Sequence, residues 1–159
     1  SMCGVRIGFL VIRSQSLHNA AMLFAQARLS PVLIGQILAT AAHNDDAEYI
    51  NSVREEYTKR RNLLVELLNE IPSVKCPKPK GAFYCVAELP VEDADDFAQW
   101  MLESFSDNGE TVMVAPASGF YSQPELGKKQ VRIAYVLKSE DLKRSVELLK
   151  LALEKYNNK

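Results

Sequence analysis

The sequence predicts an α+β fold (with an α/β portion at its start) in which a small sheet follows a long helix. Two observations predict it. From residue 81 onward the expected elements run strand, helix, strand, strand, helix, which gives a three-stranded sheet with helices on one face. Residues 1–45 instead hold one apolar strand and two apolar helices, as in a piece of a larger α/β layer. We therefore expect three parts, over residues 1–45, 46–71 and 72–159.

The composition is that of a globular protein with no strong charge. The chain has 159 residues, of which 47% are hydrophobic, and its formal net charge is −1. This balance gives no field that would attract nucleic acid or an anionic membrane, and no apolar run approaches the roughly 20 residues that span a bilayer. The three cysteines, Cys3, Cys76 and Cys85, lack metal-type spacing. We expect a cytoplasmic protein with reduced, mostly buried thiols and no metal site.

The first half of the chain is expected to be mainly helical. It opens on VRIGFLVI, residues 5–12, which predicts a buried strand because its apolar residues do not alternate with polar ones. Pro31 separates the next two helices and stands in the first turn of the second. Asp45 and Asp46 provide caps for a long amphipathic helix. The three helices are expected over residues 16–28, 31–44 and 47–71.

The second half carries the strands. A proline-rich joint over 72–81 leads into it, and a loop with two glycines and a proline covers 117–129. Asp93 and Ser139 are expected to cap amphipathic helices, the first of which directs Phe97, Trp100, Met101 and Phe105 inward. The three strands are expected over residues 81–89, 111–116 and 130–137.

Two arginines interrupt strands that are otherwise apolar. Arg6 lies in VRIGFLVI and Arg132 lies in VRIAYV. A guanidinium cannot be neutralised, so a buried one must meet an anion or several carbonyl groups. Its planar fork also fits a carboxylate or a phosphate at two points. The alternative for each is an arginine that pairs with a nearby Asp or Glu or reaches solvent, and the residues by themselves leave both possibilities open.

Three motifs resemble the class I/II, fold-type I, pyridoxal-phosphate-dependent aminotransferases. SMCGVRIGFLV resembles the segment that follows the cofactor-binding lysine of that family. GAFY resembles the strand that opens its small domain. VMVAPASGFY followed by QVRIAYV resembles its Val-x-Pro-x-x-x-Phe loop and Val-Arg-Ile strand. Their order and spacing agree across the whole chain, and further details are most like the bacterial aspartate aminotransferases.

The resemblance implies an enzyme that transfers an amino group between an amino acid, expected to be aspartate, and a 2-oxo acid such as 2-oxoglutarate. Pyridoxal 5'-phosphate would be its cofactor. By resemblance, Arg6 holds the cofactor phosphate and Arg132 binds the substrate α-carboxylate. Arg28 lies where family members reach across a homodimer interface, and it is expected to bind the side-chain carboxylate of aspartate. The alternative for Arg28 is an interaction with the helix dipole.

The sequence departs from the family at the catalytic position. The Schiff-base lysine of the family lies eight residues before Arg6, and this sequence has only five residues there. We therefore expect a C-terminal piece of an aminotransferase that contains no catalytic residue, lacks activity and cofactor by itself, and keeps residues 1–45 as a remnant of the large cofactor-binding domain. That remnant is expected to pack on another copy of the chain.

Two alternatives to an aminotransferase stay open. The first is another fold-type I pyridoxal-phosphate enzyme, a lyase or a synthase that acts on amino acids. The second is a non-catalytic α+β interaction module that uses the long helix, residues 47–71, as its partner surface. Such a module would fold without an exposed apolar segment at its start.

Overall fold

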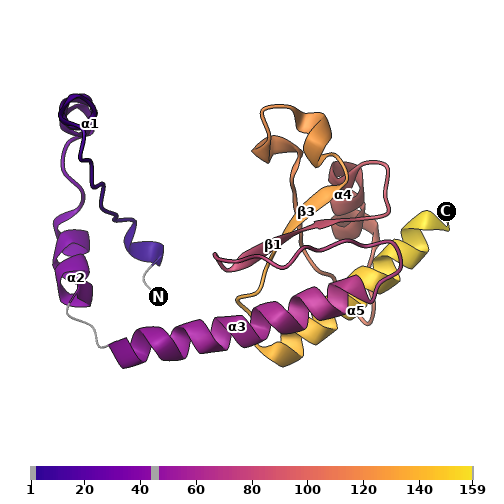
Figure 1. The fold of residues 1–159 in the computed structure, drawn as a ribbon. Coiled ribbons are helices and arrows are strands. Elements are labelled where there is room, and N and C mark those ends of the chain that lie inside the picture. Colours follow the sequence, from indigo (N-terminus) through magenta and orange to yellow (C-terminus); the bar gives the residue numbers. More distant parts are fainter. Residues whose placement is uncertain (1–2, 44–46, 159) are drawn as a thin grey trace. The chain divides into compact units, whose positions relative to one another are not determined.

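The chain forms two compact units, residues 1–51 and 52–159. The computed structural model describes residues 3–43 and 47–158 (Figure 1). The long helix α3, Ala47–Asn69, begins in the first unit and continues in the second. None of the described helices is both long enough and apolar enough to cross a membrane. The expected three-part division at residues 45 and 71 stays a prediction.

The first unit contains helices and an irregular segment. A short 3-10 helix η1, Cys3–Val5, comes first, and α1, Gln15–Arg28, and α2, Leu33–His43, follow. Both predicted helices are therefore confirmed, with ends that differ by one or two residues. Pro31 precedes α2 instead of lying in its first turn. There it accepts, through its carbonyl oxygen, a hydrogen bond of 2.8 Å from Gln36 Nε2.

The predicted strand over residues 5–12 is wrong for this chain. Residues 6–14 have no regular structure, and the side chains of Phe9, Leu10 and Val11 are 83%, 75% and 89% exposed. A strand needs a hydrogen-bonding neighbour, and residues 3–43 and 47–51 include no strand that could be one. Residues 5–12 have the composition of a buried strand, but they can be buried as a strand only if a partner outside residues 3–43 and 47–51 pairs with them.

Helix α3 packs on the second unit through its C-terminal half. Leu64, Val65 and Leu68 are buried on one side of the helix. The side chain of Asn69 closes the helix end. Its Nδ2 donates to the carbonyl oxygen of Cys76 at 3.0 Å, and its Oδ1 accepts from the Cys76 backbone N–H at 2.9 Å. This two-point contact fixes the joint between the helix and the sheet. The predicted caps Asp45 and Asp46 lie outside the described residues.

The second unit contains the predicted three-stranded sheet with helices on one face. Its strands are β1, Tyr84–Glu88, β2, Ala115–Pro116, and β3, Gln130–Ala134, in the antiparallel order β1-β3-β2. All three are shorter than the sequence predicts. Alternation along the strands directs Cys85, Ala87 and Val131 into the core, and the intervening residues lie on the other face.

Two helices complete the core of the second unit. α4 is Ala94–Ser104 and α5 is Ser139–Asn157. The prediction that Asp93 caps α4 is confirmed, because its Oδ1 accepts from the Asp95 backbone N–H at 2.9 Å. The prediction for Ser139 is wrong: Lys138 is the N-cap residue and its side chain makes no capping bond. Phe97, Met101 and Phe105 are buried as expected, while Trp100 is partly buried beside them.

The buried thiols are part of this core. Cys76 and Cys85 are free and only 4% and 2% exposed, as the sequence predicts; the side chain of Cys3 lies outside the described residues. A hydrogen bond with Cys76, together with burial, raises the pKa of the Cys85 thiol. The Cys85 thiol therefore keeps its proton and packs as a small, mainly apolar group within the core.

Candidate functional site

Arg132 lies at the centre of the sheet on the face that points away from the core. It is in β3, the middle strand, where it pairs with Val86 of β1 on one side and with Ala115 of β2 on the other. Its Cζ lies 4.6 Å from the centre of the Phe120 ring and 5.2 Å from that of the Tyr84 ring. The guanidinium is thus held over two aromatic rings, at distances typical of cation–π contacts.

The residues around Arg132 come from the second and third of the sequence motifs. Tyr84 belongs to GAFY, Phe120 belongs to VMVAPASGFY, and Arg132 itself belongs to QVRIAYV. The antiparallel register explains part of this meeting. Tyr84 pairs with Ala134, so it lies two pairs along from Arg132 and on the same face of the sheet. Segments far apart in the sequence therefore form one surface site.

Backbone contacts fix the start of the GAFY strand. The Tyr135 hydroxyl donates to the carbonyl oxygen of Ala82 at 2.9 Å, and the Tyr135 backbone N–H donates to that of Phe83 at 2.9 Å. Burial of the Tyr135 side chain raises its pKa, so the hydroxyl keeps its proton and remains a donor at neutral pH. Ala82 itself has a φ of 62°, a left-handed conformation that these contacts hold in place.

Side-chain hydrogen bonds fix the loop that carries Phe120. It includes two short 3-10 helices, η2, Ser118–Phe120, and η3, Pro124–Gly127. Ser118 Oγ forms a hydrogen bond of 2.7 Å with Asp95 Oδ2 at the start of α4. The Tyr121 hydroxyl forms another with Gln130 Oε1 of β3, also at 2.7 Å. These bonds place the Phe120 ring beside the strand that carries Arg132.

Arg132 is exposed and is not the buried guanidinium that the apolar strand suggested. Because strand residues alternate between the two faces, its apolar neighbours Val131 and Ile133 point to the core while Arg132 points away. Among the described residues no carboxylate forms a salt bridge with it. Of the two alternatives for a strand arginine, pairing with a local acid is absent here, and the side chain reaches the surface.

Arg6 and Arg28 belong to the first unit, whereas Arg132 belongs to the second. Arg6 follows η1 in the irregular segment; it is exposed and has a φ of 56°, so its expected place in a buried strand is wrong. Arg28 is the last residue of α1 and is also exposed. The described structure brings Tyr84, Phe120 and Arg132 together.

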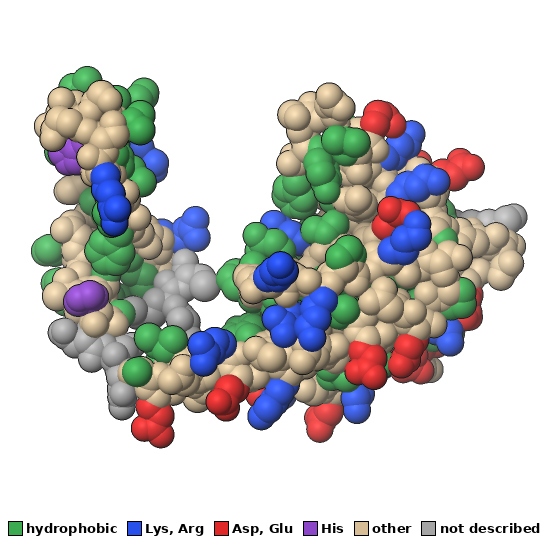
Figure 2. Space-filling view, in the orientation of Figure 1, with side chains coloured by type: hydrophobic (Ala, Val, Ile, Leu, Met, Phe, Trp, Pro, Cys, Tyr) green, Lys and Arg blue, Asp and Glu red, His purple; other side chains and the backbone are tan. Residues whose placement is uncertain are grey.

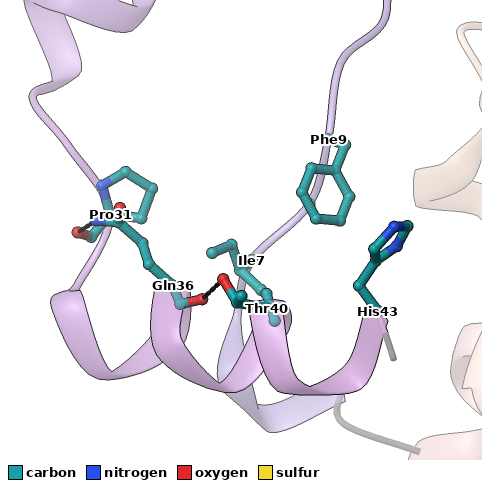
Figure 3. A pocket seen from close by; sticks show the side chains of 8 residues that line it. Ile7, Phe9, Pro31, Gln36, Thr40 and His43 are labelled. Carbon is teal, nitrogen blue, oxygen red and sulfur yellow. Dashed lines mark hydrogen bonds between the residues drawn. The ribbon is translucent and has the colours of Figure 1, made fainter. Parts of the chain in front are cut away.

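The first unit also has an apolar pocket of about 470 Å³. Figure 3 shows Ile7 and Phe9 from the irregular segment facing Thr40 and His43 of α2, with Pro31 and Gln36 at the other end. None of the three candidate arginines lines it. This lining includes no arginine and no lysine for a phosphate or a carboxylate, so the pocket is not the site that the motifs predict.

The arrangement around Arg132 can bind a carboxylate. A guanidinium offers its N–H groups in one plane, and a carboxylate accepts two of them in parallel. Among the described residues no hydrogen bond and no salt bridge uses the Arg132 guanidinium, so its N–H groups stay available to a ligand. The roles of Tyr84 and Phe120 were missed by the sequence reasoning, although both residues lie in the quoted motifs, because their contact depends on the strand register.

The chain matches the family described as "Aminotransferase class I and II" over residues 1–149. It is 32% identical to the aspartate aminotransferase of Bacillus subtilis, with 99% of this chain and 39% of that protein covered. It is 29% identical to the aromatic-amino-acid aminotransferase 2 of Thermococcus litoralis, with 97% of this chain and 38% of that protein covered. The chain therefore spans about two fifths of the length of the curated relatives that it matches.

Solved structures show the same likeness. The aromatic aminotransferase of Pyrococcus horikoshii superimposes with a TM-score of 0.77 at 28% identity, over 98% of this chain and 40% of that one. The α-aminoadipate aminotransferase LysN of Thermus thermophilus, at 23% identity, shares the fold with a TM-score of 0.78 over 96% of this chain and 39% of that one. The chain belongs to the class I and II aminotransferase family.

Proposed function

We propose that the full-length protein containing this chain is a pyridoxal-phosphate-dependent aminotransferase that transfers the amino group of aspartate to a 2-oxo acid such as 2-oxoglutarate. The observation that carries the proposal is Arg132, an exposed guanidinium held by two rings at the meeting point of two of the three family motifs. Family membership supports the reaction class. The choice of aspartate rests on several similar proteins that are named aspartate aminotransferases.

In this proposal each arginine binds a different anion. Arg132 binds the α-carboxylate that every amino acid and 2-oxo acid substrate carries, and so orients the substrate. Arg6, which is exposed, fits the phosphate group of the cofactor by charge and by its hydrogen-bond donors. When bound, pyridoxal phosphate supplies an electron sink that stabilises the negative charge left on the substrate carbon. Arg28 binds the side-chain carboxylate of aspartate from the neighbouring subunit of a homodimer.

The exposed apolar surface of the first unit agrees with a longer enzyme. Residues 1–51 expose many large apolar side chains (Figure 2), among them Phe9, Val11, Phe24 and Leu29. Exposed apolar surface of this extent marks an interface. We propose that other parts of the full-length chain and a second subunit cover it, in a cytoplasmic dimer. An autonomous interaction module would not expose such a segment, so this observation disfavours that alternative.

The test is product analysis with the full-length protein, aspartate and 2-oxoglutarate. Formation of glutamate and oxaloacetate is expected. Arg132→Lys should raise the Michaelis constants of both substrates by roughly tenfold or more, because lysine cannot make the two-point contact and a hydrogen bond to a charged group is worth about 1.5–3 kcal/mol. Arg28→Ala should raise the constant for aspartate far more than that for alanine.

Arg13 is exposed in the same unit as Arg28, and Arg13→Ala should leave both constants unchanged. Equal effects of Arg28→Ala on aspartate and alanine would remove Arg28 from the site. Consumption of the amino acid without formation of glutamate would favour a lyase or a synthase of the same fold.

A further inference from the structure

The contact between Arg132 and its two rings joins three separate elements. Tyr84 is the first residue of β1, Phe120 ends η2, and Arg132 is in β3. The rings of Tyr84 and Phe120 are partly exposed, at 37% and 56%, so neither is simply a residue of the core. Large aromatic side chains that remain at the surface beside a cation call for an explanation other than burial.

An exposed arginine normally moves among many rotamers, and a substrate that binds it must first order it. Two rings that contact the guanidinium reduce this freedom before the ligand arrives, which strengthens binding without any new contact to the ligand. The rings attract the cation through their faces and accept none of its in-plane hydrogen bonds. The guanidinium is thereby oriented while its N–H groups stay available to a carboxylate.

We propose that Tyr84 and Phe120 are positioning residues that hold the guanidinium of Arg132 ready for a substrate carboxylate. The inference rests on the proposed carboxylate-binding role of Arg132 and adds to it two residues with no assigned role. The aromatic ring is the part that matters at position 84. A phenylalanine there should therefore do what tyrosine does, and an aliphatic residue should not.

The first test measures the contact itself, in the 159-residue chain and without substrate. Protons near the face of an aromatic ring are shifted in an NMR spectrum, so the Nε–Hε resonance of Arg132 reports the two rings. Tyr84→Leu and Phe120→Leu should each move this resonance toward that of a free arginine. Tyr84→Phe should leave it in place. Leu126→Ala is a matched control, because Leu126 is an exposed residue of the same loop. An unchanged resonance in both leucine variants would overturn the proposal.

The second test uses the full-length protein and separates substrate binding from turnover. Tyr84→Leu and Phe120→Leu should each raise the Michaelis constant of the amino donor by roughly threefold, the size of one exposed cation–π contact, with kcat changed less than about twofold. Tyr84→Phe should leave the Michaelis constant of the amino donor at its wild-type value. If Arg132→Lys raises the constant and the leucine variants do not, this inference fails alone. If Arg132→Lys has no effect, the proposed role of Arg132 fails with it.

Discussion

Gly127 shows how a single residue holds the loop that carries Phe120. A Cβ atom at this position would lie 2.5 Å from the carbonyl oxygen of Ala117 and 2.7 Å from Cδ2 of the Tyr121 ring. The first neighbour is backbone, so rotation of a side chain cannot relieve the clash. Any larger residue must push the segments around Ala117 and Gly127 apart, and Phe120 lies between them in the chain.

Gly127→Ala should therefore lower the free energy of unfolding by about 1–3 kcal/mol, the usual cost of inserting a methyl group into a packed site. Urea unfolding followed by circular dichroism measures the change. The matched control is Gly119→Ala in the same loop, because a Cβ there meets nothing within 4 Å. That substitution should change the free energy by less than about 0.5 kcal/mol. Similar losses for both variants would show that close packing at Gly127 is not the cause.

The two helix starts in the second unit differ in a way that can be measured. Asp93 accepts the backbone N–H of Asp95, whereas Ser139 is the first residue of α5 and follows a cap that has no side-chain bond. Asp93→Ala should cost about 1 kcal/mol of stability, as loss of an N-cap does, and Asp93→Asn should cost less. Ser139→Ala should cost less than about 0.5 kcal/mol. Thermal unfolding of the three variants checks this, and a larger loss for Ser139→Ala than for Asp93→Ala would contradict the assignment of the caps.

Elements that depend on local sequence were predictable, and elements that depend on a partner were not. Hydrophobic periodicity placed α1, α2 and α3 within about two residues at each described end, because a helix makes its own hydrogen bonds. Residues 5–12 and 111–114 have suitable strand composition but pair with no neighbouring strand among the described residues. Propensity describes what fits a sheet, and only pairing makes a strand.

The candidate site was likewise predictable only where it depends on local sequence. Arg132 could be singled out because a cation within VRIAYV conflicts with its apolar surroundings. Its exposure and its two rings could not be predicted, because they follow from which face of β3 it occupies and from the path of the 117–129 loop. The sequence therefore identified the charged group of the site, and the fold supplied the groups that orient it.

At the scale of the whole molecule, burial is concentrated in the second unit. Every buried hydrophobic residue in the described structure lies between Leu64 and Leu153. In the described part of the first unit only Gly35 is buried within its helices. Since burial of apolar surface provides most of the favourable free energy of folding, the stability of this chain resides in residues 52–159.

A shortened chain of residues 52–159 should consequently fold without the first unit. It should unfold cooperatively in urea, with a midpoint close to that of the 159-residue chain, because it retains all the buried hydrophobic residues of the described structure. In the longer chain, amide hydrogens of residues 3–43 should exchange much faster than those of β3 and α5. The matched control is a chain of residues 72–159, which loses Leu64, Val65 and Leu68 of α3 and should fail to fold. An unfolded 52–159 chain, or strong protection in residues 3–43, would show that the first unit contributes stability through contacts other than burial.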